Sequence, residues 1–413
     1  MTTTSQRRGL LANLVGLATA GALVLTGCVT ATEPTSAPKP RPDLSLSIGA
    51  LLPQTGALAS FGPAAQAGVQ LAVADINAAD VGITVTSMSG DSGDATTDLS
   101  IASATQLLDQ NVSVIVGAIS DGVSKKVIDQ IVGAGVIQIS PGNSSLDFSR
   151  YADKDLYWRT SPSCAREGAA LGQQIADSGV KTLGIVYQTG YCDPGLPEAI
   201  ADTFERAGGE VVARTEFDAA ATSVSAQVAE VVAEKPQAVA IVTPTLAKLA
   251  VPDLTAAGFT GNDLYFAGLG IADQSADFAA GSLTGATATL PGLDIATLGD
   301  FTDRLLGVNP ALIDFSYAAE TYDGVILVAL AALAAGDTSG AAIAGKLQEV
   351  SGGSGEGEKA TSFEDAAGII LSGAVVDYDG PSGSIDFDEN GDPASAVIGL
   401  YSYGADNTFL RIN

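Results

Sequence analysis

The chain has 413 residues, 46% of them hydrophobic, with 47 acidic against 19 basic side chains and a formal net charge of −28. Binding nucleic acid needs clustered Lys and Arg, so we expect no nucleic-acid partner. The sequence has no histidine, which excludes Ser-His-Asp and Cys-His catalysis and His-ligated zinc. We therefore expect no metal and no cofactor. The length suffices for two domains of about 100–200 residues each.

The first 27 residues have the pattern of an export signal. Arg7 and Arg8 precede an uncharged apolar run over 10–25, which ends at Leu-Thr-Gly-Cys28. The run is shorter than the ~20 residues of a spanning helix, although an ordinary signal peptide or a short anchor remains an alternative. The ending resembles the lipobox of bacterial lipoprotein signal peptides. That resemblance implies cleavage before Cys28, lipidation of its thiol, and an exported chain anchored to the outer face of the cell membrane.

A proline-rich segment follows over residues 28–43. It contains four prolines and shows no apolar periodicity, which is typical of an extended, semi-rigid spacer. We expect it to tether a globular body to the membrane.

From residue 44 onward, short β-rich runs alternate with Ala-rich stretches of helical spacing. The expected strands are 46–52, 83–88, 112–117, 136–140, 182–187, 210–215, 238–243 and 264–267. The expected helices are 64–77, 101–108, 123–132, 168–178, 196–207 and 224–233. This alternation predicts an α/β fold with doubly wound parallel sheets, in which ligands bind at the carboxyl ends of the strands.

The last third of the chain departs from this rhythm. Glycine and serine dominate 351–357, which we expect to be a flexible surface loop, and 383–409 returns to strand character around a turn at 388–392. Cys164 and Cys192 remain once Cys28 is assigned to the lipid. In an exported chain they suggest one disulfide, the alternative being two separate buried thiols.

An ordered set of motifs resembles the branched-chain amino-acid-type (Leu/Ile/Val-binding-like) solute-binding proteins of ABC importers. The motifs span nearly all of the chain after the tether, and each one alone is weak. They are Ile48-Gly-Ala-Leu-Leu-Pro-Gln-Thr-Gly56 with 71–77, Val116-Gly-Ala-Ile-Ser-Asp-Gly-Val-Ser124, Ile139-Ser-Pro-Gly-Asn-Ser144, Trp158-Arg-Thr-Ser-Pro162, Ala318-Ala-Glu-Thr-Tyr-Asp-Gly324 and Gly383-Ser-Ile-Asp-Phe-Asp-Glu-Asn-Gly391.

The resemblance implies the type I periplasmic-binding fold, with two α/β lobes joined by three crossovers. We expect lobe one to combine 44–162 with 290–382, and lobe two to combine 163–289 with 383–413. Closure of such lobes on a ligand is a hinge motion. The implied partners are a small-molecule ligand and the membrane subunits of an ABC importer.

Two interpretations of Asp121 remain open. The family usually has a serine there that holds a ligand carboxylate at a helix start, which suits an anion. Asp121 would repel a carboxylate unless the ligand brings it an amine, and Asp is also an excellent N-cap. Ser120 could supply the hydroxyl instead.

Other expected ligand contacts come from the resemblance. In lobe one these are Gly142 and Ser144, with a plain turn as the alternative, and Phe61, with packing in its own loop as the alternative. In lobe two they are Tyr191, Thr243 and Leu269. Leu269 stands where amino-acid binders commonly place an acid for the ammonium, and both Cys164 and Cys192 fall on cleft-edge loops.

The leading functional hypothesis is a lipid-anchored receptor of an ABC importer that closes on a small polar ligand, an amino acid or a related metabolite. The alternative is a receptor of the same fold that senses a ligand in signalling. We expect no enzyme activity. Carboxylate pairs such as Asp91 with Asp94, or Asp386 with Asp388, lie in predicted turns, where solvated Asp is common.

Overall fold

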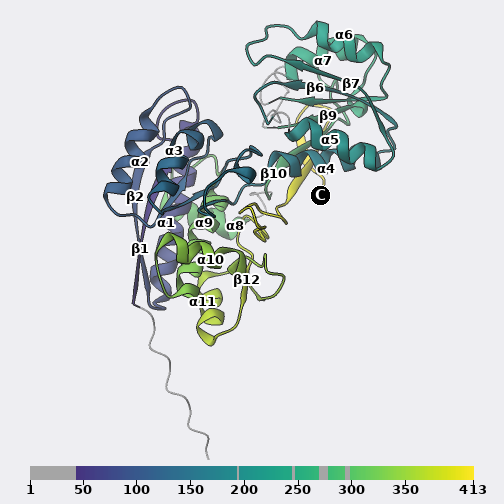
Figure 1. The fold of residues 1–413 in the computed structure, drawn as a ribbon. Helices are drawn as coiled ribbons and strands as arrows, with labels where there is room; N and C mark the ends of the chain where they lie inside the picture. The colour runs from purple at the N-terminus through teal and green to yellow at the C-terminus, as the bar shows by residue number, and fades with distance from the viewer. Residues whose placement is uncertain (1–42, 193–194, 244–246, 269–277, 294–297) are drawn as a thin grey trace, which may run out of the picture. The chain divides into compact units, whose positions relative to one another are not determined.

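A computed structural model of the chain describes residues 43–192, 195–243, 247–268, 278–293 and 298–413. Its strands are β1 Leu44–Leu52, β2 Ile83–Asp91, β3 Val114–Gly117, β4 Ile137–Ser140, β5 Tyr157–Arg159, β6 Thr182–Gln188, β7 Glu210–Phe217, β8 Ala238–Val242, β9 Leu264–Ala267, β10 Thr287–Pro291, β11 Glu358–Ala360, β12 Val376–Tyr378, β13 Ile398–Tyr403 and β14 Phe409–Arg411. Its α-helices are α1 Gly62–Ala79, α2 Leu99–Asp109, α3 Asp121–Gly133, α4 Cys164–Asp177, α5 Gly195–Arg206, α6 Ser225–Ala233, α7 Ala247–Ala256, α8 Gly299–Val308, α9 Ala318–Ala335, α10 Gly340–Val350 and α11 Phe363–Ser372 (Figure 1).

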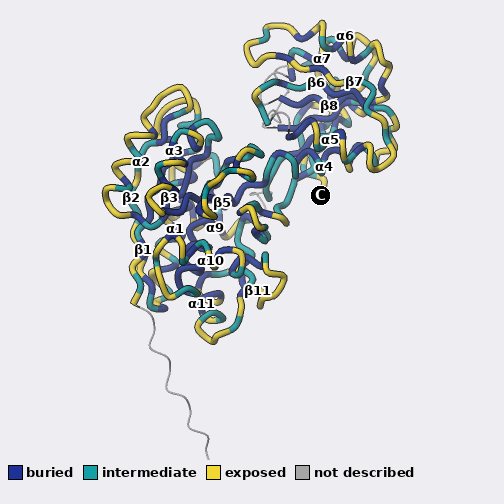
Figure 2. Tube along the Cα trace, in the orientation of Figure 1, coloured by how far each residue is buried: buried dark blue, intermediate teal, exposed yellow. Residues whose placement is uncertain are grey.

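The first sheet has the strand order β2-β1-β3-β4-β5, and all its strands are parallel. Successive side chains of a strand point to opposite faces, so each face builds its own core. Ile48 and Ala50 pack in the core that contains α1 and α9, whereas Leu51 packs on the other face against α2 and α3. Figure 2 shows the central strands of this sheet as buried.

The second sheet has the order β14-β13-β10-β9-β8-β6-β7. Strands β6 to β10 are parallel, and its two cores again divide by residue parity. Val239 and Ile241 of β8 pack in the core with α6 and α7, whereas Ala240 and Val242 pack in the core with α4 and α5. Both sheets are therefore covered by helices on both faces.

This arrangement confirms the predicted α/β fold with two doubly wound parallel sheets. Each of the eight expected strands is present, with ends shifted by up to three residues. Strands β13 and β14 are antiparallel to their neighbours, whereas the prediction was for parallel strands throughout. A short turn joins them, closed by the Gly404 N–H donating to the Thr408 carbonyl at 2.8 Å, and parallel strands would need a long crossover.

Two expectations for the end of the chain need correction. Of 383–409, only 398–403 and the start of β14 form strand ladders, because Asp388 accepts the backbone N–H groups of Asn390 and Asp392 in a tight turn. The segment 351–357 is not wholly a surface loop. Ser351 is fully buried, and its hydroxyl accepts the Phe387 N–H at 3.0 Å.

Helix α9 is the central helix of the first core. Within the described part of the chain, it is the one helix with the length and hydropathy of a membrane span, but 83% of it is buried inside the protein. It packs so closely on α1 that a Cβ added to Gly68 would collide with the Ala318 carbonyl oxygen. It is a core helix, and its amino-terminal end lies at the cavity described next.

Candidate ligand-binding site

A cavity of about 400 Å³ lies at the carboxyl ends of the strands. Its wall includes residues that follow β1, β3 and β4 of the first sheet and β6 and β10 of the second. Six of the eight residues expected to bind a ligand line it: Phe61, Ser120, Asp121, Gly142, Ser144 and Tyr191. Strand order in the first sheet reverses at β1 and β3, which is where doubly wound sheets place their ligands.

The structure separates the roles of Ser120 and Asp121. Ser120 is the N-cap of α3, and its hydroxyl accepts the Val123 N–H at 3.4 Å. Asp121 is the first residue inside the helix, and its Oδ1 accepts the backbone N–H of Ser144 at 3.0 Å. Burial raises the pKa of Asp121. Asp121 is therefore not the helix cap, and its carboxylate instead holds the loop after β4.

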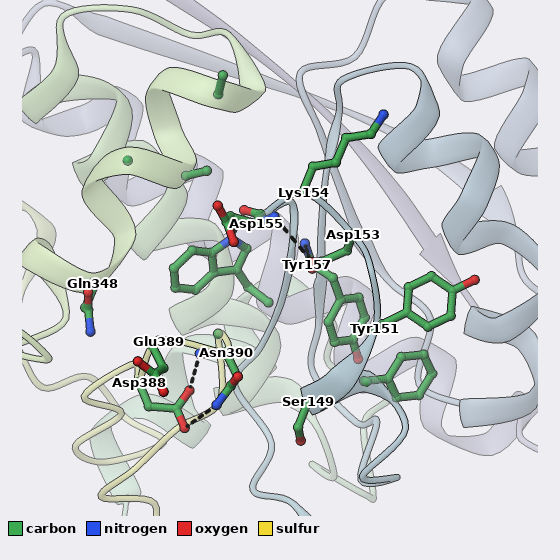
Figure 3. Close-up of a pocket in the computed structure, with 16 residues that line it drawn as sticks. Ser149, Tyr151, Asp153, Lys154, Asp155, Tyr157, Gln348, Asp388, Glu389 and Asn390 are labelled. Atoms are coloured by element: carbon green, nitrogen blue, oxygen red, sulfur yellow. Dashed lines mark hydrogen bonds between the residues drawn. The ribbon is translucent and has the colours of Figure 1, made fainter.

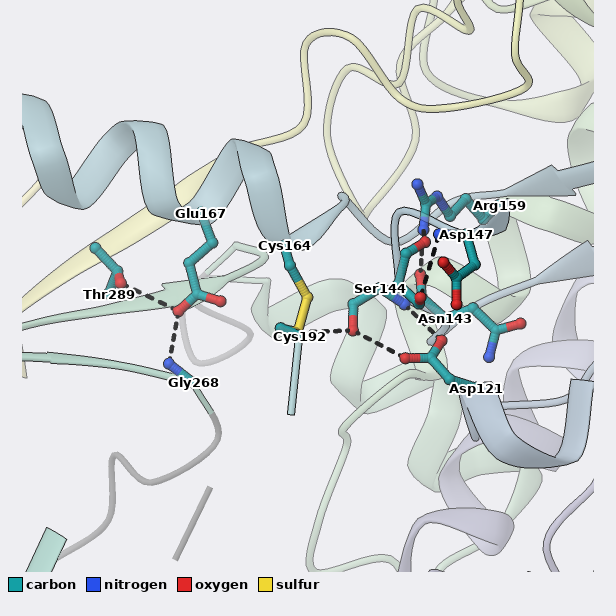
Figure 4. Close-up of a disulfide and its surroundings, with 11 residues drawn as sticks. Asp121, Asn143, Ser144, Asp147, Arg159, Cys164, Glu167, Cys192, Gly268 and Thr289 are labelled. Atoms are coloured by element: carbon teal, nitrogen blue, oxygen red, sulfur yellow. Dashed lines mark hydrogen bonds between the residues drawn. A yellow bond between two sulfur atoms is a disulfide. The ribbon is translucent and has the colours of Figure 1, made fainter. Parts of the chain in front are cut away.

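Ser144 has most of its hydrogen-bonding capacity satisfied within the chain (Figure 4). Its hydroxyl lies 3.5 Å from Oδ2 of Asp121 and 3.6 Å from Sγ of Cys192, and its carbonyl oxygen accepts the Cys164 N–H at 2.9 Å. Cys164 and Cys192 are joined in a disulfide with a Cα–Cα separation of 5.8 Å. The bridge connects the start of α4 to the loop after β6, and both halves contact Ser144.

Phe61 and Gly142 complete the part of the wall near α9. The Phe61 ring meets the Tyr317 ring edge-to-face, with centroids 5.3 Å apart. A Cβ on Gly142 would lie 2.8 Å from the Ile119 side chain and 3.1 Å from the Tyr317 ring, so a larger residue would require the Ile119 side chain to shift. Both positions are therefore packed against the amino-terminal end of α9.

The three residues expected from the second sheet have different positions. Tyr191 lines the cavity, with its ring against Gly268. Thr243 is outside the cavity wall; it is buried, and its hydroxyl donates to Oε1 of Gln188 at 2.9 Å. The expectation of a ligand contact at Thr243 gains no support from this cavity. Leu269 lies outside the described residues.

Sequence reasoning missed two glutamates that line the cavity. Glu167 of α4 is 3% exposed, and its Oε1 accepts the Gly268 N–H at 2.9 Å and the Thr289 hydroxyl at 3.1 Å (Figure 4). Burial raises its pKa to about 7. Glu320 of α9 has a buried Oε2 with no hydrogen-bond partner among the described residues, and burial raises its pKa as well.

Signals for both glutamates were present in the sequence. Glu320 lies inside one of the quoted motifs, and Glu167 is one helical turn from Cys164, which the resemblance places on a loop at the edge of the cleft. Tyr317 and Tyr401 also line the cavity and were not predicted. Their burial depends on how α9 and β13 pack, which local patterns do not reveal.

A second cavity, of about 560 Å³, is less suited to binding (Figure 3). It is lined by the 388–391 turn, by α10 and by the segment before β5. Two of its acidic side chains stabilise local turns: Asp153 accepts the Tyr157 N–H at 2.7 Å, and Asp388 accepts the Asn390 N–H at 2.8 Å. Nothing in this wall is left buried and unpartnered in the way that Glu320 is.

Comparison with known proteins identifies the family. The family model described as "Periplasmic binding protein" matches residues 45–391. The chain belongs to the periplasmic binding protein family. It is 26% identical over 370 residues to the "Chemotactic signal transduction system substrate-binding protein BasB" of Halobacterium salinarum, a match that covers 86% of each chain.

Solved structures of periplasmic binding proteins share the fold. The leucine-binding protein LivK of Thermotoga maritima has a TM-score of 0.65 at 18% identity, covering 89% of this chain and 98% of its own. LivJ of Streptococcus pneumoniae, solved in complex with isoleucine, has a TM-score of 0.62 at 18% identity, covering 89% and 100%. The resemblance seen in the sequence motifs is thereby confirmed, and the type I periplasmic-binding fold with it.

Proposed function

We propose that this periplasmic binding protein is an extracytoplasmic receptor that binds a small organic ligand, an amino acid or a related metabolite, without chemical turnover. The observation that carries the proposal is the cavity of about 400 Å³, whose wall is built from loops at the carboxyl ends of both sheets. The proposed ligand contacts are Phe61, Gly142, Ser144 and Tyr191, together with Glu167 and Glu320, which line the same cavity. Asp121 also lines it, but its carboxylate accepts the Ser144 N–H. Ser120 lines the same wall but caps α3.

The two lobes around this cavity are proposed from the family resemblance, with the bounds 44–162 plus 290–382 and 163–289 plus 383–413. Ile385 and Phe387 pack in the core of the first sheet, whereas β13 belongs to the second. We therefore place the third crossover between Pro393 and Ile398, later than residue 383. Hinge motion at the three crossovers would let the lobes close on the ligand.

The receptor could pass its ligand or its closed state to one of two partners. Uptake through an ABC importer is the function implied by the sequence motifs. Signalling is favoured by the relative from Halobacterium salinarum, whose name places it in chemotactic signal transduction and which matches over 86% of this chain. Deleting the gene and measuring uptake and directed motility toward the same ligand separates the two. Lost uptake supports import, and lost motility with normal uptake supports sensing.

Membrane attachment is proposed through a lipid on Cys28, followed by the tether over 28–43. These residues lie outside the described part of the chain, so the sequence pattern alone supports the proposal. A lipid anchor would keep the receptor near either kind of membrane partner.

A melting screen with amino acids, amides, amines, aromatic acids and sugars tests the proposed function. A ligand that binds only the folded state stabilises it by mass action, by about 2.7 kcal/mol at a hundredfold excess over Kd. We expect at least one compound to raise the Tm, with that compound recovered unchanged. A silent screen, or turnover of the compound, would contradict the proposal.

A further inference from the structure

The charges of the cavity wall are all of one sign. Three carboxylates line it, those of Asp121, Glu167 and Glu320, and no Lys or Arg is among its described lining residues. The cations nearest the wall are engaged with other groups. Arg159 pairs with Asp392 at 2.7 Å, and Lys125 pairs with Asp147 at 2.5 Å. Arg411 lies behind the wall, where it donates to the Gly292 carbonyl at 3.1 Å and its guanidinium lies over the Tyr401 ring. An anionic ligand would therefore meet three carboxylates and no lining Lys or Arg among the described residues.

The backbone donor most suited to an anion is already occupied. Asp121 lies in the first turn of α3, and its carboxylate accepts the N–H of Ser144 while also lying beside the Ser144 hydroxyl. A ligand carboxylate would have to displace this internal carboxylate from a buried position. The chain thus supplies its own anion where the helix start and the following loop would otherwise attract one.

Two of the carboxylates retain unused acceptor capacity. Glu167 spends Oε1 on Gly268 and Thr289, and its Oε2 makes no hydrogen bond with the described residues. Oε2 of Glu320 is in addition shielded from solvent and has no partner among the described residues. For Glu320, a buried carboxylate oxygen without a donor is costly, and a bound N–H group or positive charge removes that cost.

The rest of the wall suits an organic cation more than a metal ion. Within the described residues no cluster of three or more potential metal ligands exists, and the lining includes the aromatic rings of Phe61, Tyr191 and Tyr317. The ring of Tyr401 also lines the cavity, but the Arg411 guanidinium lies over it. Aromatic faces attract alkylammonium groups, and apolar side chains such as Leu290 and Leu293 offer contact to a hydrocarbon body.

From these observations we infer that the cavity takes an organic cation that carries no carboxylate, an amine or alkylammonium with an apolar body, with Glu167 and Glu320 as its counter-charges. The inference rests on the proposed function, because it names the ligand class of the same cavity. It separates this chain from a receptor for free amino acids such as isoleucine, which carry a carboxylate as well.

Matched pairs of compounds on the purified full chain test the inference. The pairs are 3-methylbutylamine with leucine, phenethylamine with phenylalanine, and choline with glycine betaine. In the first two pairs the amino acid carries one additional carboxylate, and in the third a carboxylate replaces the hydroxymethyl group of choline. We expect the amine of at least one pair to raise the Tm and to bind more tightly than its partner in calorimetry. Amino acids, amides or carboxylates that bind while every amine fails would overturn the inference and leave the receptor function standing. If no compound of the wider melting screen raises the Tm either, both the inference and the proposed receptor function are contradicted.

Charge-neutral variants then test the two glutamates with the best-binding amine. Glu320→Gln and Glu167→Gln should each weaken its binding by about 10- to 100-fold, the loss expected for one charge-assisted hydrogen bond. Glu364→Gln is the matched control, because it removes the same charge from an exposed site on α11 that does not line the cavity. Equal affinities for all three variants and the parent chain would show that Glu167 and Glu320 do not contribute to ligand binding.

Discussion

Glu167 couples the cavity to the pH dependence of folding. Its pKa is raised from 4.5 to about 7 because the side chain is 3% exposed and the ionised form loses its hydration. The folded state therefore holds this proton over a pH range in which the unfolded state has released it. By linkage, the contribution of Glu167 to the free energy of unfolding falls as pH rises from about 4.5 to about 7 and is constant above that pH.

The size of this contribution follows from the shift. At 1.36 kcal/mol per pKa unit, the change from 4.5 to about 7 amounts to about 3 kcal/mol, of which about 2 kcal/mol falls between pH 5 and pH 8. Glu167→Gln keeps an oxygen that can accept from Gly268 and Thr289 and removes the titration. We expect the unfolding free energy of this variant, measured by urea denaturation, to fall by about 2 kcal/mol less between pH 5 and pH 8 than that of the parent chain.

Asp323 offers a matched control for this experiment. It is fully buried in α9, its pKa is raised by burial to about 7, and it does not line the cavity. In Asp323→Asn, the new amide group can donate to the Tyr378 hydroxyl that now donates to Oδ1 at 2.9 Å. This variant should flatten the pH dependence in the same direction and leave ligand affinity unchanged. An unaltered pH dependence in Glu167→Gln, with a flattened one in Asp323→Asn, would refute the burial argument for Glu167.

Four further outcomes are expected. Thiol counting on the denatured, unreduced chain should find Cys164 and Cys192 blocked, and Cys164→Ser with Cys192→Ser should cost about 2–4 kcal/mol of unfolding free energy; two free thiols would contradict the bridge. Asp121→Ser should free the Ser144 N–H, so that the affinity ratio of leucine to 3-methylbutylamine rises, and an unchanged ratio would count against internal occupation of that donor. Asp392→Asn should cost about 3–5 kcal/mol, because it leaves the guanidinium of Arg159 buried without its counter-charge; a loss below about 1 kcal/mol would show that other groups compensate. Cys28→Ala should release the protein from the membrane fraction, and retention there would contradict lipid anchoring at that residue.

Much of the fold could be predicted because the composition of each strand is recognisable in the sequence without knowledge of its neighbours. Runs such as 238–243 are almost wholly apolar, as expected for strands buried on both faces, and the alternation with helices implies parallel pairing. The antiparallel strand β13 was harder to predict, because it pairs with β10, more than a hundred residues earlier in the chain. The turn at 388–392 was found, but its ion pair between Asp392 and Arg159 depends on long-range packing.

The cavity wall was predictable where it follows strands and not where it comes from helices. Gly142, Ser144 and Tyr191 lie in loops after β4 and β6, and Asp121 begins the helix that follows β3, which is where ligands bind in doubly wound sheets. Phe61 lies between β1 and α1. Thr243 shows the limit of that rule, since its hydroxyl turns to Gln188 instead.

Glu167 and Glu320 lie within helical patterns, where a charged residue in sequence is normally on the solvated face. Only tertiary packing places α4 and the start of α9 beside the same cavity, and this packing shields the two carboxylates from bulk solvent. Leu269 stands at the position where amino-acid binders of this family commonly have an acidic residue. Compared with the family motifs, this chain therefore lacks the acid at position 269 and has an additional one at Asp121. Packing changes that account. The carboxylate of Asp121 accepts the Ser144 N–H, and Glu167 and Glu320 line the cavity from helices α4 and α9. Under the proposed function, ligand preference would therefore depend on two glutamates to which the sequence comparison assigned no ligand contact.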